Sequence, residues 1–396
     1  MKLLRNPLFL SLSLSHFIID VLNGQTGILL AVLSVPLRLS NSTIGLIATV
    51  YALTGSLSQP VFGWLSDRWG SRWAAAGGVL WMALFFSLVA VAPGFWPIIF
   101  LVIGSLGSAA FHPPGAMQAA RIGHLHMTGQ VATAASIFFL FGQGGLSVGP
   151  GVAGVLIDNL GRVGLLLLTG LTLPIGLWTA WQMRPSELGQ AAGKPARDSQ
   201  PAGPAVSPDM MLFALIILLA GLRTWAQSIT TTFAPKFFQD QDVSPTVYGA
   251  IVAVFMGSSA IGGVMGALLA DRWGRRRTVT LALGLSILPF YWFPQVEGVW
   301  IYALVGLAGF FNGAPHSVFI TLAQRALPGR AAFASGLTLG LMFAFGALGA
   351  YLGGIVGDRV GLRLVLQGNA AIAVVTTLVS LAMRGGVKRA VAVAAG

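Results

Sequence analysis

Apolar stretches long enough to cross a membrane follow one another along almost the entire chain. A helix needs about 20 mostly apolar residues to cross roughly 30 Å of hydrocarbon. Residues 212–221 are apolar throughout, whereas the strands of a membrane barrel alternate between apolar and polar residues. Only 9% of the residues are charged, against roughly 25% in a typical soluble domain. We therefore predict an all-α membrane protein that lies in a lipid bilayer.

Polar residues, prolines and glycines divide the chain into twelve predicted transmembrane helices. The one long hydrophilic stretch, residues 184–209, is rich in proline, glycine, alanine and serine, which is typical of a linker. It separates a predicted six-helix bundle at residues 1–183 from another at residues 210–396. The twelve helices are expected to start near residues 7, 43, 73, 95, 128, 163, 210, 245, 278, 298, 330 and 361.

The distribution of basic residues predicts how the chain is oriented. Loops on the cytoplasmic side of a membrane retain Lys and Arg. With the first residue inside, seventeen of the 23 Lys and Arg residues are cytoplasmic, five are outside and Arg223 lies within a helix. We therefore expect a multi-pass protein of a bacterial inner membrane with both termini in the cytoplasm. Nucleic acid is not an expected partner, because no basic soluble domain carries the net charge of +12.

An internal repeat relates the two halves of the chain. Residues 67–70 (DRWG) recur at 271–274, a shift of 204, and His112 and His316 share that shift. Asp158 and Asp358 are shifted by 200, which requires only a shorter loop. Six helices per repeat place both halves in the same orientation. Such parallel repeats enclose a central cavity and rock around it, as transporters do.

Two loops at equivalent places in the repeat carry glycine, an acid and a cluster of arginines, and they resemble the signature loop of the major facilitator superfamily. The resemblance implies the twelve-helix fold of that superfamily. A carboxylate here can cap a helix N-terminus and pair with arginine, which would latch the cytoplasmic side; the alternative is a charged turn that follows the orientation rule. The predicted gating residues are Gly63, Asp67, Arg68, Gly70 and Arg72 in the first loop and Gly266, Asp271, Arg272, Gly274 and Arg275 in the second. The second loop departs from the pattern, with Ala267 where Gly63 would map.

Residues 145–154 (GLSVGPGVAG) resemble the glycine-proline motif of exporters in the same superfamily. Small residues allow two membrane helices to approach closely, and a proline frees a backbone carbonyl. We expect Gly149, Pro150 and Gly154 to act in helix packing. The motif favours antiport, although ordinary packing produces similar helices.

Asp20 is the only acidic residue predicted to lie within the hydrocarbon. An ionised carboxylate at the centre of a membrane helix costs roughly 2.5–3.5 kcal/mol on insertion scales, so such groups usually face a cavity and often take part in proton transfer. His16 lies one turn earlier and provides an alternative, because the two side chains can simply pair with each other.

Arg223 lies near the middle of the helix that begins the second half. Its guanidinium keeps its charge, so it needs either an acidic partner or an anionic substrate. Asp20 and Arg223 are expected to face each other across the cavity, or else to form a permanent salt bridge. His112 and His316 accept protons or contact substrate on one interpretation and only pack on the other. The predicted substrate- and proton-binding residues are Asp20, His16, His112, Arg223, His316, Gln59, Gln143 and Gln227.

Three parts of the first half carry a further pattern: residues 15–20 with His16 and Asp20, residues 44–63, and the sequence Phe111-His112-Pro113. Together they resemble bacterial fosmidomycin-resistance transporters. Members of that family typically export a small phosphonate antibiotic by proton antiport, which implies an anionic substrate for Arg223. The family tends to have a glutamate after His-Pro, where this chain has Pro114, so Asp20 or His112 would have to carry any proton coupling.

The sequence therefore predicts a secondary active transporter that exports a small anionic or amphiphilic compound by alternating access, with protons as the coupling ion. The alternative is uptake of an organic anion or a sugar-like metabolite. We do not expect an enzyme, because no zinc or nucleotide motif occurs and the GxSxG pattern at 145–149 lies inside a predicted helix. No cofactor and no metal site are expected, and the protein is expected to be a monomer.

Overall fold

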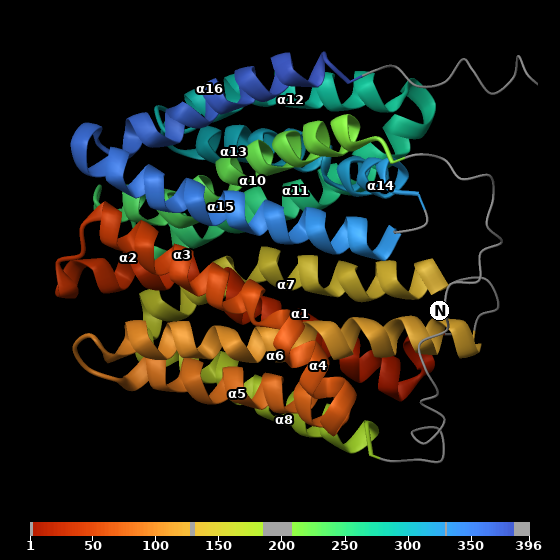
Figure 1. The fold of residues 1–396 in the computed structure, drawn as a ribbon. Coiled ribbons are helices and arrows are strands. Elements are labelled where there is room, and N and C mark those ends of the chain that lie inside the picture. The colour runs from red at the N-terminus through yellow and green to blue at the C-terminus, as the bar shows by residue number, and fades with distance from the viewer. Residues whose placement is uncertain (1–2, 127–130, 185–207, 329–330, 384–396) are drawn as a thin grey trace, which may run out of the picture.

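The computed structural model describes residues 3–126, 131–184, 208–328 and 331–383, and all regular elements within them are helices. The helices form two bundles, one from each half of the chain (Figure 1). This architecture confirms the predicted all-α fold of two six-helix repeats. The predicted linker at 184–209 lies almost entirely outside the described residues, as do the helix starts expected near 128 and 330.

The N-terminal bundle follows a short 3-10 turn, η1 (Leu3–Arg5). It contains α1 (Pro7–Gly24), α2 (Thr26–Leu37), α3 (Asn41–Leu57), α4 (Gln59–Trp69), α5 (Ser71–Val91), α6 (Trp96–His126), α7 (Val131–Leu160), η2 (Arg162–Leu165) and α8 (Leu166–Gln182). The C-terminal bundle contains α10 (Met210–Gln239), α11 (Pro245–Trp273), α12 (Arg275–Trp292), α13 (Val299–Gly313), α14 (His316–Ala326), α15 (Ala331–Val360) and α16 (Leu362–Ser380).

Three of the predicted membrane helices are broken into two pieces, which the sequence did not indicate. The first breaks at Gln25, where the hydroxyl of Thr26 donates to the carbonyl of Asn23. The second breaks at Ser58, two residues before Pro60, and another breaks next to Pro315. A proline removes one helical hydrogen bond and its ring clashes with the preceding turn, which explains the second and third breaks.

Eleven helical segments of the described chain are long and apolar enough to span a membrane. Where two pieces are separated by a break, they form one segment. The remaining helix, α12, has eighteen residues and begins with three arginines, so it lacks a weakly charged stretch of the required length. It packs against α13 and α16 within its bundle. The protein is therefore a multi-pass membrane protein.

The two bundles meet at one end of the molecule. We call this the far end, and we call the end where α8 stops and α10 starts the linker end. Across the bundles α3 packs on α15, α7 packs on α11, and α2 packs on α10. These contacts are backbone to backbone, because a Cβ atom on Gly45, Gly154 or Gly354 would overlap a main-chain oxygen of the opposite bundle.

Two equivalent aspartates bind the opposite bundle at the far end. Asp358 on α15 accepts hydrogen bonds from the backbone N–H groups of Asn41 (2.7 Å) and Ser42 (2.9 Å), at the N-terminus of α3. Asp158 on α7 accepts a hydrogen bond from the hydroxyl of Thr246 (2.6 Å), at the N-terminus of α11. A carboxylate stabilises the positive end of a helix, so each repeat contributes one such contact to the closed far end.

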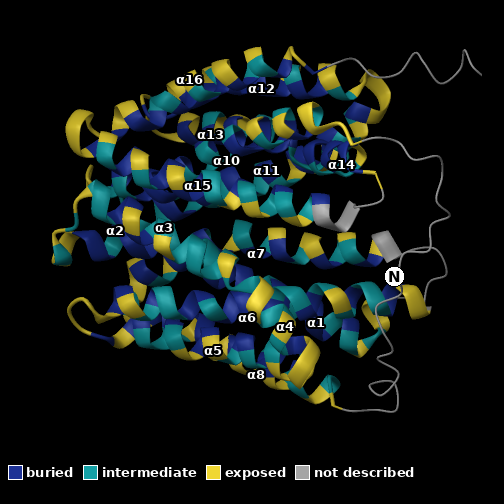
Figure 2. Ribbon diagram, in the orientation of Figure 1, coloured by how far each residue is buried: buried dark blue, intermediate teal, exposed yellow. Residues whose placement is uncertain are grey.

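Toward the linker end, the same helix faces separate. On α15 the positions of Gly336 and Gly340 have open space beside them, and Phe343 is 49% exposed, although Ala347 in the next turn contacts α3. On α7, Gln143 is exposed one turn before Ser147, whose hydroxyl reaches α11. Buried residues gather inside the bundles, while exposed residues recur along α7 (Figure 2). A cleft between the bundles therefore opens toward the linker end.

Replacing both Asp158 and Asp358 with asparagine is expected to favour a conformation whose far end is open. Losing two carboxylate contacts with helix N-termini removes about 1–2 kcal/mol, a shift of roughly 5- to 30-fold in the conformational equilibrium. Spin labels on a pair of cysteines added across the far end measure this shift, since the chain has no cysteine of its own. The matched control is Asp240→Asn, because Asp240 follows the last residue of α10 and pairs with Lys236 of the same helix, not with the opposite bundle. Equal distance distributions in the double variant and the control would contradict the proposed role.

Candidate functional site

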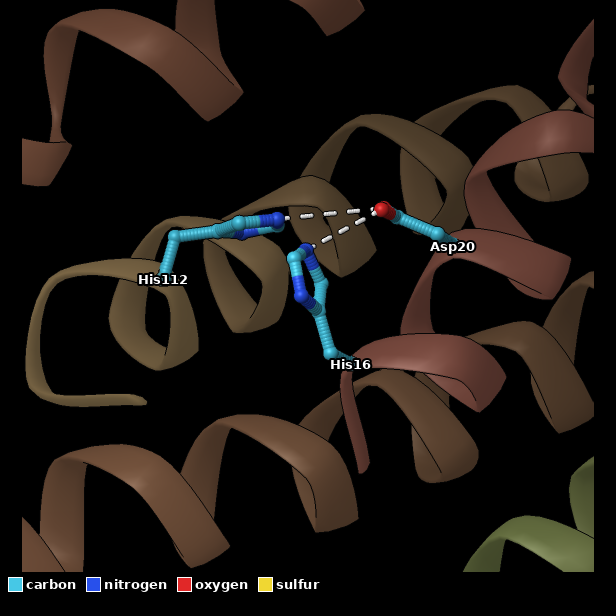
Figure 3. Close-up of side chains that lie close together, drawn as sticks. All are labelled: His16, Asp20 and His112. Atoms are coloured by element: carbon cyan, nitrogen blue, oxygen red, sulfur yellow. Dashed lines mark ion pairs between the residues drawn. The ribbon is translucent and has the colours of Figure 1, made fainter. Parts of the chain in front are cut away.

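Three ionisable side chains, those of His16, Asp20 and His112, converge in the N-terminal bundle, and we call them the Asp20 cluster. His16 and Asp20 lie one turn apart on α1, and His112 reaches them from α6 (Figure 3). The Nε2 atom of His16 lies 3.3 Å from one carboxylate oxygen of Asp20, and Nε2 of His112 lies 3.8 Å from the other. All three residues were predicted as binding residues, and the pairing of His16 with Asp20 that the sequence left open is present.

The hydrogen bonds of the two imidazoles fix which nitrogen carries a proton. Nδ1 of His16 lies 2.8 Å from the carbonyl oxygen of Phe138, and Nδ1 of His112 lies 2.7 Å from that of Ser108. A carbonyl oxygen only accepts hydrogen bonds, so both Nδ1 atoms are donors. In the neutral rings, both Nε2 atoms therefore direct a lone pair at the ionised carboxylate. The two Nε2 atoms and the carboxylate are then all acceptors, so none can donate a hydrogen bond to another. A proton or a cation between them would let them bind to one another.

A network of neutral polar residues holds the carboxylate in place. The amide of Asn23 donates to Asp20 (2.8 Å) and to the hydroxyl of Ser108 (3.0 Å). The hydroxyl of Tyr51 on α3 donates to the amide oxygen of Asn23 (2.6 Å). The sequence analysis missed Asn23, Tyr51 and Ser108. Asn23 was the one with a detectable signal, because it lies three residues after Asp20 and so on the same helix face.

Helix α7 covers this cluster with a glycine. A Cβ atom on Gly142 would overlap Nε2 of His16 and a carboxylate oxygen of Asp20. The ring of His16 also stacks on Phe138 of α7, with 4.2 Å between the ring centroids. The space between the imidazole and the carboxylate therefore depends on a residue without a side chain, which the sequence analysis also missed.

A second polar group lies in the C-terminal bundle around Arg223. Its Nε donates to the carbonyl oxygen of Asn312 (2.6 Å), and one terminal nitrogen donates to the side-chain oxygen of Gln227. The other terminal nitrogen lies 3.3 Å from Nδ1 of His316, which accepts because the guanidinium has no lone pair to offer. Neutral His316 therefore keeps its proton on Nε2.

No carboxylate of the described chain lies within ion-pair distance of Arg223. Asp20 and Arg223 therefore do not form the permanent salt bridge that the sequence left as an alternative. Both residues lie thirteen positions after the first residue of their helices, α1 and α10. At about 1.5 Å per residue, each is roughly 20 Å from the linker end. The structure thus places an acidic group and a basic group at the same depth, in different bundles.

The three predicted glutamines have different surroundings. Gln227 belongs to the group around Arg223. Gln143 is exposed on the face of α7 toward the cleft, next to Gly142, whereas Gln59 is half-buried at the start of α4. Neither Gln143 nor Gln59 forms a hydrogen bond with the Asp20 cluster or with Arg223 within the described chain.

The predicted latch of the two signature loops does not form in this structure. Gly70 and Gly274 adopt positive φ angles of 96° and 88° between consecutive helices, a conformation that favours glycine. Asp67 and Asp271 are both exposed, and neither forms an ion pair with another described residue. The facing helices separate toward the linker end, and within the described chain neither carboxylate caps a helix of the opposite bundle.

The remaining loop residues act within their own bundle. Arg72 donates to the carbonyl oxygen of Ala180 (2.8 Å), and Arg68 lies over the ring of Trp64. Gly266 allows α11 to approach the carbonyl of Ala314, so its role is close packing. In the second half, Arg272 lies exposed beside Asp271, and Arg275 starts α12.

The glycine-proline motif of α7 serves both bundles. Gly149 packs on the main chain of Val21 in α1, and Gly154 packs on Pro245 of α11 in the opposite bundle. The carbonyl of Pro150 meets Gly249 of α11. The motif therefore sits where the far end closes.

Comparison with known proteins identifies the family of the chain. The family model of the Major Facilitator Superfamily matches residues 9–241 and 216–390. The chain belongs to the Major Facilitator Superfamily. The Fosmidomycin resistance protein of Escherichia coli (strain K12) is 27% identical over 367 residues, which cover 90% of this chain and 88% of that protein. The resemblance predicted from the sequence is thereby confirmed.

Two further similarities are informative. The Gentisate transporter of Corynebacterium glutamicum is 26% identical over 339 residues, which cover 79% of this chain and 71% of that one. A solved bacterial homologue of the human lysosomal transporter Spinster, in an inward-facing and occupied conformation, matches with a TM-score of 0.80 at 15% identity, over 96% of this chain and 97% of that chain. At that identity the structural similarity shows the fold alone. The superfamily and these relatives are transporters, which confirms that the chain is not an enzyme.

Proposed function

We propose that this member of the superfamily exports a small anionic compound from the cytoplasm in exchange for protons. The observation that carries the proposal is the buried guanidinium of Arg223, which has no acidic partner among the described residues. Buried charges in proteins are normally paired. An anionic group of the substrate would provide the missing charge, at a depth where transporters of this type bind their cargo.

The Asp20 cluster is the proposed proton site. A proton fits between the Nε2 atoms of His16 and His112 and the carboxylate of Asp20. Protons can reach this place through His112, because its side chain is partly exposed. Antiport requires that proton and substrate compete for binding. They compete if the substrate also carries a hydrogen-bond donor, because this donor and the proton then need the same carboxylate oxygens of Asp20. The proposed substrate therefore combines an anionic group for Arg223 with a donor for Asp20.

The closed far end and the open linker end support a transport cycle by alternating access. The seventeen basic residues expected at the linker end favour a cytoplasmic location for that end and for both termini. Substrate would enter the cleft from the cytoplasm. The bundles, 1–183 and 210–396, would then rock about the linker at 184–209, closing the signature loops and separating Asp158 and Asp358 from the opposite bundle. Protonation of Asp20 from outside would displace the substrate, and loss of the proton inside would reset the site.

Uptake of an organic anion is the second candidate. The Gentisate transporter is a relative whose name specifies an organic acid as cargo. If the substrate contacts Arg223 only, a proton on the Asp20 cluster and the bound anion attract each other, and the two would travel together. Both candidate functions use the same residues. Export requires that a bound proton weakens substrate binding, whereas uptake requires that it strengthens substrate binding.

Expression in a drug-sensitised bacterial strain tests the direction of transport. We expect the protein to raise resistance to an exported anionic compound, with fosmidomycin as the first probe, and a protonophore to remove this resistance. Export would be contradicted if the cells became more sensitive to the compound. It would also be contradicted if they accumulated the labelled compound faster and the same protonophore abolished this accumulation. A vector without the gene provides the baseline for both arms.

A further inference from the structure

Three ligand atoms of the Asp20 cluster have the arrangement of a metal site. One ring nitrogen of His16, one ring nitrogen of His112 and a carboxylate oxygen of Asp20 all lie within 4.8 Å of one another. Figure 3 shows both imidazoles directed at the carboxylate from two different helices. Zinc is bound by histidine nitrogens and carboxylate oxygens at about 2.0–2.2 Å, so two ligands of one tetrahedral ion lie about 3.3–3.6 Å apart. The His16–Asp20 distance of 3.3 Å is close to that range already.

The residues behind the ligands also match a metal site. Histidines that bind metals almost always donate their second ring nitrogen to a carbonyl or carboxylate, and ligating carboxylates are themselves hydrogen-bonded. Here the Nδ1 atoms of His16 and His112 donate to backbone carbonyls, and Asn23 donates to Asp20. These bonds fix both Nε2 lone pairs on the side of the carboxylate.

One ligand provides both adjustment and access. Nε2 of His112 lies 3.8 Å from the nearer carboxylate oxygen of Asp20, which is slightly too long for two ligands of one ion. The side chain of His112 is 23% exposed, whereas those of His16 and Asp20 are 3% and 8% exposed. The ring of His112 must therefore move toward Asp20 to complete the site, and its partial exposure gives water or an anion access to a bound ion.

We propose that His16, Asp20 and His112 bind one divalent transition-metal ion of the kind that prefers imidazole and carboxylate ligands, with Zn²⁺ as the probe. Imidazole suits zinc, copper, iron and nickel, whereas Mg²⁺ and Ca²⁺ prefer oxygen ligands. The proposal goes beyond transport, because it needs only the geometry of three atoms. A metal bound here also occupies the position of the proposed coupling proton, so Zn²⁺ is expected to inhibit transport.

Zn²⁺ binding is measured on the purified full chain, with any histidine tag removed, by competition with a chromophoric chelator at one fixed pH. We expect one ion per chain. His112→Gln is expected to weaken binding at least about tenfold, and Asn23→Ala about 10- to 100-fold, as for other residues behind metal ligands. Gly142→Ala is expected to weaken it too, because the added Cβ fills the space between the ligands without removing any.

The matched control is His124→Gln, since His124 is an exposed histidine near the end of the same helix α6. This variant should bind Zn²⁺ as the parent does. Gel filtration and circular dichroism confirm that each variant is folded. Absence of stoichiometric binding, or equal binding by His112→Gln and the parent, would overturn the proposal. Zn²⁺ binding is measured without a pH gradient and without a transported compound. A chain that does not bind Zn²⁺ can therefore still couple transport to protons, and a chain that does not couple transport to protons can still bind Zn²⁺.

Discussion

Replacing Asp20 with asparagine is expected to abolish transport driven by a pH gradient while leaving the protein folded in the membrane. Asparagine has nearly the same size and can occupy the same place between His16 and Asn23, but it cannot bind and release a proton in the accessible range. In the parent, acidification is expected to weaken substrate binding about 5- to 150-fold, the usual strength of coupling between two sites. In the variant this pH dependence should disappear, and flux under a pH gradient should fall to the level of empty vesicles.

Reconstituted vesicles with an imposed pH gradient provide the measurement. Glu297→Gln is the matched control, because Glu297 is an exposed acid in the segment between α12 and α13, far along the chain from the cluster. It should transport like the parent. If vesicles with Asp20→Asn accumulate substrate at the normal rate under the same gradient, Asp20 does not carry the coupling proton.

Replacing Arg223 with glutamine is expected to remove most of the affinity for an anionic substrate. A hydrogen bond to a charged group contributes about 1.5–3 kcal/mol, so binding should weaken roughly 10- to 150-fold. Glutamine can still reach one of the partners of Arg223, but it brings no charge. Arg223→Lys keeps the charge and loses the fork that contacts Asn312 and Gln227, so an intermediate affinity is expected.

Substrate affinity of purified protein at constant pH tests this expectation. Arg276→Gln is the control, since Arg276 is an exposed arginine at the linker end of α12. It removes the same charge from the chain and should leave affinity unchanged. Parent-like affinity in Arg223→Gln would show that the anion binds elsewhere.

The residues that the sequence could identify are those with a charge or a periodic signal. Asp20 and Arg223 stand out because a charge in an apolar helix is costly, and His16 is found from its spacing of one helical turn. His112 and His316 are found through the repeat. The approach of α6 to α1 is a tertiary contact, so no local pattern shows that His112 reaches Asp20 while Arg223 does not.

The features that the sequence could not show are of two kinds. Asn23, Tyr51 and Ser108 are neutral, and Gly142 is one of 52 glycines, so nothing in composition separates them from packing residues. The latch of the signature loops is absent from this structure and stays a prediction for a conformation in which the linker ends meet. This structure contains one conformation, with the far end closed, in which Asp158 and Asp358 bind the opposite bundle.

Proton exchange on substrate binding tests the central proposal most directly. Purified protein in weakly buffered solution near neutral pH is mixed with saturating substrate, and a pH indicator follows the protons released or taken up. If substrate and proton compete for Asp20, the parent releases protons when substrate binds. The number released rises to about one per bound substrate at a pH low enough for the cluster to be fully protonated beforehand. Asp20→Asn is expected to release none. Uptake of protons by the parent, or equal release from the parent and Asp20→Asn, would contradict proton-coupled export through this cluster.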